Sequence, residues 1–127
     1  MKIDHIAVSS NSEEKADKFF NKLLGLKQIK SFMVSDDLME QFFGVRKEQK
    51  IVRYGNDEVS VEVFITYENN QASDKFTHNC LIIEDRISLI EKARKLNIEM
   101  IKVSRKDSEN FYLFLKDSYG NLFEIKS

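Results

Sequence analysis

The fold of this 127-residue chain is marked most clearly by its last stretch, Lys116-Asp117-Ser118-Tyr119-Gly120-Asn121-Leu122-Phe123-Glu124-Ile125-Lys126-Ser127. The first half of the stretch predicts a turn, because Asp, Ser, Gly and Asn form local side-chain bonds or adopt positive φ. The second half predicts a short strand, whose alternation separates Glu124 from Phe123 and Ile125. A carboxylate is costly to bury without a partner, so the face that carries Glu124 is expected to meet either water or a cation.

The composition narrows the class of protein. A chain of 127 residues suits one compact domain or two small modules that share a core. The net charge of −1, without a long basic run, argues against nucleic acid or an anionic membrane as a partner. No window approaches the roughly twenty apolar residues of a membrane span, and the charged N-terminus does not resemble a signal peptide. The single cysteine excludes an internal disulfide and favours a reducing compartment, so we expect a cytoplasmic protein.

The order of the expected elements is similar in the two halves of the chain. In the first half, apolar spacing predicts strands at residues 3–8, 26–34, 50–54 and 58–66, with a helix at 10–25 and a short helix at 35–44. After a polar connector at 67–76, the second half predicts a strand at 77–83, a helix that begins at Asp85, and strands at 98–103, 111–116 and 122–126. The shared order is strand, helix and three strands, so we expect two modules, at about residues 1–68 and 76–127.

Local signals set the expected boundaries in the first half. Ser10 followed by Glu13 fits a capping box at the start of the helix, and Gly25 fits the residue after its last turn. Residues 55–57 predict a hairpin turn. In the strand after that turn, one face is expected to carry Val59, Val61, Val63 and Ile65, and the other Ser60, Glu62 and Phe64.

Each half places a histidine in its first strand and a glutamate in its last. These residues are His5 and Glu62 in the first half, and His78 and Glu124 in the second. Imidazole nitrogen and carboxylate oxygen suit a divalent transition metal, and two of each leave positions open for a substrate. A single histidine on a strand is more often structural, but both histidines of this chain occupy matching positions. The pattern therefore favours a metal site.

Other residues near this pattern have simpler interpretations. Cys80 projects to the same side as His78 and is expected to be a small buried residue rather than a ligand or nucleophile. Arg46 and Arg53 are candidate anchors for a substrate carboxylate or phosphate, although arginines on strands are usually solvated. Strand alternation predicts that the metal ligands share their face with a mostly small and apolar set, namely Ala7, Ser60, Phe64, Cys80 and Leu122.

Three segments resemble the vicinal oxygen chelate superfamily, which includes glyoxalase I, fosfomycin resistance proteins, bleomycin-binding proteins and extradiol dioxygenases. They are Ile3-Asp4-His5-Ile6-Ala7-Val8, Phe19-Phe20-Asn21-Lys22-Leu23-Leu24-Gly25-Leu26 and Asp117-Ser118-Tyr119-Gly120-Asn121-Leu122-Phe123-Glu124-Ile125. The resemblance implies a single α+β domain of two paired βαβββ modules, whose mixed sheets curl around a cavity. It also implies a homodimer with the site at or near the interface.

The resemblance is closest to glyoxalase I in the ligand set, which implies metal ligands at His5, Glu62, His78 and Glu124. The implied cofactor is a divalent ion (Ni, Zn, Co, Mn or Fe), and the implied reaction is that of an isomerase or lyase acting on a small vicinal-oxygen substrate. Glu124 or Glu62 is the candidate catalytic base. The typical glutathione contacts of glyoxalase I are missing, because Ser9 and Thr66 stand where those enzymes usually have Arg and Asn.

Two alternatives remain open from the sequence. The chain could be a small-molecule binding protein of the antibiotic-resistance type, which uses the same cavity without catalysis. It could also use the four ligands only as a metal clip that stabilises a dimer.

Overall fold

The computed structural model describes residues 3–69, 71, 76–105 and 109–127 and confirms the expected α+β class. The chain divides into two units, residues 1–69 and 70–127, which we call the first and second modules. Each contains a four-stranded mixed sheet. The predicted connector at 67–76 lies partly outside the described residues, since positions 70 and 72–75 are not among them. No helix in the described ranges is long and apolar enough to cross a membrane.

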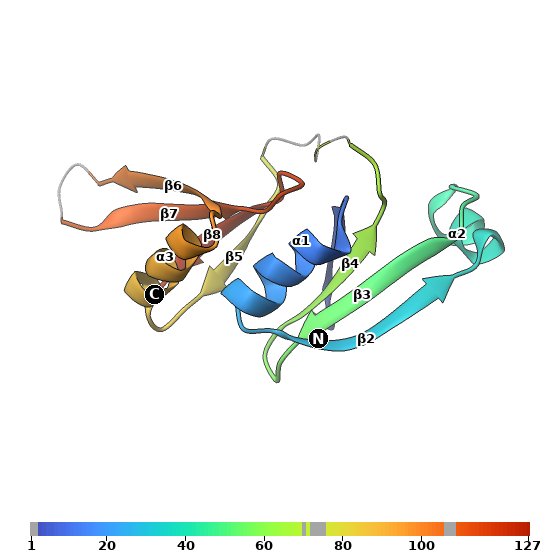
Figure 1. The fold of residues 1–127 in the computed structure, drawn as a ribbon, viewed down its shortest axis with the longest axis horizontal. Coiled ribbons are helices and arrows are strands. Elements are labelled where there is room, and N and C mark those ends of the chain that lie inside the picture. The colour runs from blue at the N-terminus through green and yellow to red at the C-terminus, as the bar shows by residue number, and fades with distance from the viewer. Residues whose placement is uncertain (1–2, 70, 72–75, 106–108) are drawn as a thin grey trace. The chain divides into compact units, whose positions relative to one another are not determined.

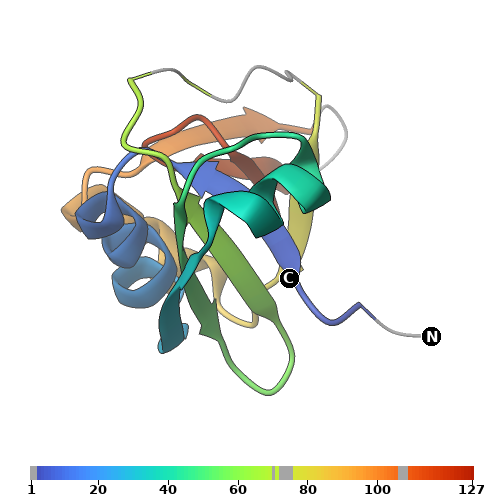
Figure 2. The same ribbon diagram turned by 90° about the vertical axis from the view of Figure 1, so that its right-hand side faces the viewer.

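The first module contains β1 (Ile6–Ser10), α1 (Glu13–Asp17), the π-helix η1 (Lys18–Leu23), β2 (Lys27–Val34), α2 (Asp36–Phe43), β3 (Gln49–Gly55) and β4 (Ser60–Ile65). Its strand order is β1-β4-β3-β2, as can be followed in Figure 1. β1 runs parallel to β4, and the remaining neighbours are antiparallel. Figure 2 shows α2 as a short helix that joins the end of β2 to the start of β3.

The second module contains β5 (His78–Ile82), α3 (Arg86–Lys95), β6 (Glu99–Ser104), β7 (Phe111–Lys116) and β8 (Leu122–Lys126). Its strand order is β5-β8-β7-β6, and β5 runs parallel to β8. The two sheets therefore share one topology, in which the first strand of a module lies beside its last. The predicted repeat of element order is confirmed, and α2 is the addition that distinguishes the first module.

One face of each sheet contributes to an apolar core. In the first module the buried core residues include Phe19, Phe20, Leu23, Val52, Tyr54, Val61, Val63 and Ile65. The rings of Phe20 and Tyr54 are stacked, with centroids 5.6 Å apart, which ties η1 to β3. In the second module the buried core residues include Leu89, Ile90, Ala93, Leu113, Leu115, Phe123 and Ile125. Alternation leaves the opposite face of each sheet for the polar residues, as predicted for Glu62 and Glu124.

The first helix begins and ends differently from the prediction. The predicted capping box of Ser10 and Glu13 is wrong: the N-cap is Ser12, whose hydroxyl accepts a hydrogen bond from the Lys15 amide at 3.2 Å. Ser10 is still the last residue of β1, so it lies too early to cap the helix. The helix then widens into η1, where the Leu24 amide donates to the Phe19 carbonyl, five residues back.

Gly25 ends the helix as predicted, with φ of +74°. The hairpin turn after β3 lies later than predicted, because Gly55 is still the last residue of the strand. The side chain of Asn56 forms the turn by accepting hydrogen bonds from the amides of Glu58 and Val59, both at 2.9 Å.

The turn between β7 and β8 is held by Asp117. Its carboxylate accepts hydrogen bonds from the amides of Tyr119 (3.0 Å) and Asn121 (2.9 Å) and from the Asn121 side chain (2.8 Å). Burial raises the pKa of Asp117, and these hydrogen bonds oppose that shift. The turn starts β8 in a register that buries Phe123 and Ile125, so Glu124 lies on the opposite face.

Replacing Gly25 tests the left-handed end of the first helix. An added Cβ at this position would meet no atom within 4 Å, so any loss of stability comes from the backbone conformation alone. We expect Gly25→Ala to lower the free energy of unfolding by about 1 kcal/mol and Gly25→Asn to lower it less, since Asn tolerates positive φ. Urea denaturation measures both, and an alanine variant as stable as the parent would contradict this helix end.

Candidate metal centre

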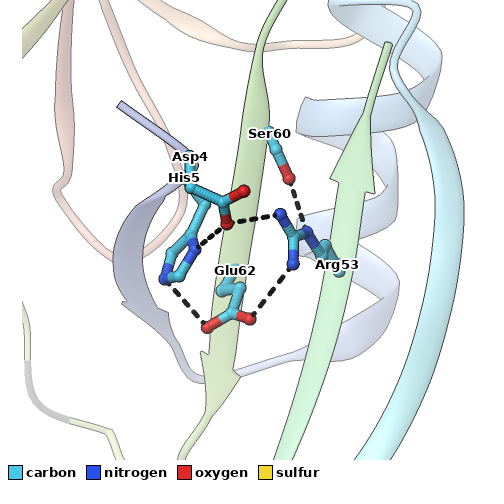
Figure 3. Close-up of polar contacts among 5 residues, drawn as sticks. All are labelled: Asp4, His5, Arg53, Ser60 and Glu62. Carbon is cyan, nitrogen blue, oxygen red and sulfur yellow. Dashed lines mark hydrogen bonds and ion pairs between the residues drawn. The ribbon is translucent and has the colours of Figure 1, made fainter. Parts of the chain in front are cut away.

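The first module brings His5 and Glu62 together. His5 lies one residue before β1, and Glu62 lies in the middle of β4. Parallel pairing aligns Ala7 with Glu62, so the imidazole two residues earlier reaches the same face of the sheet. His5 Nε2 is 3.3 Å from Glu62 Oε2. Figure 3 shows the two side chains facing each other.

The second module brings His78 and Glu124 together in the same way. His78 is the first residue of β5, and Glu124 lies on β8. The parallel register pairs Cys80 with Glu124, the counterpart of Ala7 with Glu62. His78 Nε2 is 3.6 Å from Glu124 Oε2. Within each module, the histidine therefore lies beside the glutamate that it matches in the sequence pattern.

In each imidazole, the Nδ1 atom, which does not face the glutamate, already has a hydrogen-bond acceptor. His5 Nδ1 lies 2.8 Å from Asp4 Oδ2, and His78 Nδ1 lies 2.9 Å from the carbonyl oxygen of Phe76. A carboxylate and a carbonyl only accept hydrogen bonds, so Nδ1 is assigned the proton in both rings. In a neutral imidazole Nε2 is then an acceptor, and it faces a carboxylate oxygen that is also an acceptor. Such a contact is favourable only with a proton or a cation between the two atoms.

The spacing of each pair fits two ligands of one ion. Two donors that each lie about 2.1 Å from a metal are about 3.0–3.4 Å apart at octahedral to tetrahedral angles. The observed 3.3 and 3.6 Å are within a few tenths of an ångström of that range. Within either module, the described residues hold no group of three or more His, Cys, Asp or Glu side chains placed to bind an ion. Each module thus supplies two donors, and the full set of four stays a prediction.

The carboxylates are more shielded than the imidazoles. Glu62 and Glu124 keep 15% and 16% of their side-chain exposure, whereas His5 and His78 keep 36% and 40%. The two pairs are therefore shielded from solvent to a similar degree. When the imidazole is neutral, this shielding makes the contact between two acceptors costly, because water screens the atoms less than it would on an open surface.

Basic groups approach the two carboxylates differently. On β3, Arg53 is paired with Glu62, and its Nη1 lies 3.8 Å from Glu62 Oε1. On β7 the corresponding partner of Glu124 is Phe114, whose ring lies edge-on to His78 at 5.7 Å. Glu124 instead has Lys126 Nζ at 3.7 Å.

Asp4 is a site residue that sequence reasoning missed. It accepts hydrogen bonds from His5 and, at 2.9 Å, from Arg53 Nη2, and these two bonds lower the pKa of its carboxyl. The available signal was its position directly before His5, where a carboxylate can reach the imidazole. Arg46, the other candidate anchor, forms ion pairs with acidic residues of α2, namely Asp36, Asp37 and Glu40.

The strand registers confirm which residues share a face with the glutamates. Ala7, Ser60 and Phe64 lie on the face of Glu62 in the first sheet, and Cys80 and Leu122 lie on the face of Glu124 in the second. The expected burial of Cys80 is wrong, because its side chain is exposed. Cys80 lies on the face of β5 opposite the apolar core, so it contributes nothing to the packing there.

Removing the negative charge of Glu124 tests whether His78 Nε2 is a hydrogen-bond acceptor that faces the Glu124 carboxylate. In metal-free protein at pH 8, the amide of a Glu124→Gln variant would donate to His78 Nε2, which replaces an unfavourable contact by a hydrogen bond. We expect the free energy of unfolding to rise by about 0.5–1 kcal/mol. The control is Glu99→Gln, the same change in an exposed ion pair with Lys116. A loss of stability in Glu124→Gln, measured in a chelating buffer, would contradict the assignment of Nε2 as an acceptor.

Comparison with known proteins places this geometry in a family. Residues 2–125 match the model of the Glyoxalase/Bleomycin resistance protein/Dioxygenase superfamily. A glyoxalase family protein from Enterococcus faecalis is 15% identical, with 99% of this chain and 97% of that chain covered and a TM-score of 0.73. The fosfomycin resistance protein FosX from Mesorhizobium loti is 13% identical, with 98% and 90% covered and a TM-score of 0.69.

A third structure is a Glu-to-Gln mutant of FosX from Listeria monocytogenes, complexed with Mn(II) and 1S,2S-dihydroxypropylphosphonic acid. It is 16% identical, with 98% of this chain and 88% of that chain covered and a TM-score of 0.70. No curated protein matches the chain. At these identities the structural likeness establishes the fold, while the family match extends over nearly all of the sequence. The chain belongs to the glyoxalase/bleomycin resistance/dioxygenase superfamily.

Proposed function

We propose that this protein is a metal-dependent isomerase or lyase of the vicinal oxygen chelate type that acts on a small substrate with two neighbouring oxygens. The observation that carries the proposal is the same in both modules: a shielded carboxylate oxygen lies 3.3 or 3.6 Å from an imidazole Nε2, a spacing at which both atoms can bind one cation. Proteins retain such contacts where a cation joins the two groups.

The four residues that would hold the ion are His5, Glu62, His78 and Glu124. Their nitrogen and oxygen donors suit Ni, Zn, Co, Mn or Fe. Superfamily membership and the Mn(II) in the FosX complex support a divalent ion of this kind. When bound, the ion would stabilise negative charge on two adjacent substrate oxygens.

The glutamates are the candidate bases for removing a proton next to a carbonyl. Their environments differ, because Glu62 lies beside the Arg53 guanidinium and Glu124 beside the Phe114 ring. Apart from the basic groups that pair with them, Arg53 and Lys126, these sheet faces carry small or apolar residues near the glutamates, such as Ala7 and Leu122. Such a surface suits a small substrate better than a large polyanion.

Glutathione adducts are poor candidates for the substrate. Thr66, which stands where glyoxalase I enzymes usually have Asn, uses both its amide and its hydroxyl to bond the Ser10 carbonyl, at 2.8 and 3.3 Å. Ser9 has no positive charge with which to bind a glutathione carboxylate. We further propose a cytoplasmic homodimer, with the site at or near the interface and each chain forming one glyoxalase-like domain.

Metal stoichiometry tests whether the two pairs serve one site. After chelation and reloading with Mn²⁺, Co²⁺, Ni²⁺ or Zn²⁺, we expect one tightly bound ion per chain by elemental analysis. Replacing either His5 or His78 by Ala should weaken metal binding by more than about 100-fold. This loss exceeds the effect of substituting residues that only orient the metal ligands. Two ions per chain, or variants that each lose only half of the bound metal, would show that the pairs act separately.

Turnover by carboxamide variants tests catalysis. Fosfomycin, acyl-CoA epimers and thiol adducts of 2-oxo aldehydes form a suitable screen for the metal-loaded protein. For a substrate that is turned over, Glu62→Gln or Glu124→Gln should lower kcat by about 100-fold or more while metal is retained, because a proton acceptor is lost. Unchanged turnover in both variants would remove the base assignment. Tight binding of one of these compounds without turnover would instead identify a binding protein.

A further inference from the structure

We infer that Asp4 and Arg53 are positioning residues that hold both metal-binding side chains of the first module in their binding orientation. The inference rests on the proposed metal site. Arg53 holds Asp4, Asp4 holds the His5 imidazole with Nε2 directed at Glu62, and Arg53 also approaches Glu62 itself. These contacts form a closed ring, which Figure 3 shows together with Ser60.

Asp4 determines which nitrogen of His5 carries the proton. Its Oδ2 accepts from His5 Nδ1 at 2.8 Å and from Arg53 Nη2 at 2.9 Å. The Asp4 side chain is 76% exposed, so without these two bonds it would be solvated and free to rotate. Without Asp4, the imidazole could move its proton to Nε2 and donate it to Glu62, which would fill the gap where a cation would lie. Asp4 therefore keeps the pair available for a metal.

Arg53 is itself fixed by its position in the sheet. Antiparallel pairing places Arg53 opposite Glu62 and Gly55 opposite Ser60. Arg53 Nε donates to Ser60 Oγ at 2.7 Å, which sets the plane of the guanidinium. The Nη2 and Nη1 atoms of the guanidinium then point to Asp4 and to Glu62 Oε1, respectively. This arrangement leaves Glu62 Oε2 for His5. Each of the three guanidinium nitrogens has a partner in the protein, which favours a role in orienting the pair over a role in binding a substrate anion.

The second module achieves the same imidazole orientation without these side chains. His78 Nδ1 bonds to a backbone carbonyl, that of Phe76, and Phe114 occupies the sheet position that corresponds to Arg53. Substitutions at Asp4 or Arg53 should therefore disturb His5 and leave His78 unchanged. Because the chain has only two histidines, His78 is an internal control in any spectrum of the imidazoles.

The test is long-range ¹H–¹⁵N NMR of the two imidazoles in metal-free protein at pH 8, together with Zn²⁺ affinity. We expect both rings of the parent protein to carry the proton on Nδ1. In Asp4→Ala, His5 should shift towards the Nε2-protonated form and Zn²⁺ affinity should fall by about 10- to 100-fold, as for other residues that orient metal ligands. Arg53→Gln should change both readouts in the same direction. Arg46→Gln, which removes an equal charge from an ion-paired arginine beside α2, should change neither.

Each result decides the inference. Unchanged His5 tautomer and unchanged Zn²⁺ affinity in Asp4→Ala would overturn it, as would an equal change at His78. If Arg53→Gln does not fold, Arg53→Lys keeps the positive charge but not the planar guanidinium. A Zn²⁺ affinity of Arg53→Lys equal to that of the parent would show that the Arg53 guanidinium does not orient the pair. If the parent binds no Zn²⁺ but His5 changes tautomer in Asp4→Ala, the proposed function fails while the orienting role of Asp4 stands.

Discussion

In each module a proton or a cation must lie between an imidazole nitrogen and a carboxylate oxygen, and this constraint governs the site. In each module an imidazole Nε2 lies 3.3 or 3.6 Å from a carboxylate oxygen, while Nδ1 of the same ring is already bonded to an acceptor. A neutral imidazole with its proton on Nδ1 forms no hydrogen bond to this carboxylate, whereas an amide in place of either carboxylate would donate one. A proton or a metal ion between the two atoms makes the contact favourable, and a nitrogen and an oxygen at this spacing suit a single metal ion.

The topology explains why the pair occurs in both modules. The first strand of each module runs parallel to its last, so a histidine at the start of the first strand reaches the glutamate in the middle of the last. The apolar core takes the other face of each sheet, which leaves the pair on the polar face. The modules differ in how they hold the imidazole: the first uses Asp4 and Arg53, and the second uses the backbone carbonyl of Phe76. The backbone solution needs no charged neighbour, which allows Phe114 to occupy the position of Arg53.

Much of this arrangement was predictable from residue types and spacing. Alternation placed Glu62 and Glu124 on the faces opposite the core, and the repeated element order indicated that His5 and His78 are equivalent. The Arg53 contacts were not predictable, because they depend on the exact hairpin register. The predicted turn at 55–57 would pair Arg53 with Val59, whereas the observed turn pairs it with Glu62. Ser12 was missed as the helix cap for a similar reason: β1 continues two residues beyond its predicted end and so includes Ser10.

The most direct test of the account is X-ray absorption spectroscopy of the Zn²⁺-loaded protein. The proposal that it tests is that both imidazoles and both carboxylates bind one ion through Nε2 and Oε atoms. It predicts a first shell of nitrogen and oxygen at about 2.0–2.2 Å, with outer-shell scattering from two imidazole rings for each metal. A sulfur neighbour at about 2.3 Å would assign the site to Cys80, and a spectrum with one imidazole per metal would show that the two pairs do not share an ion. Either result would contradict the account.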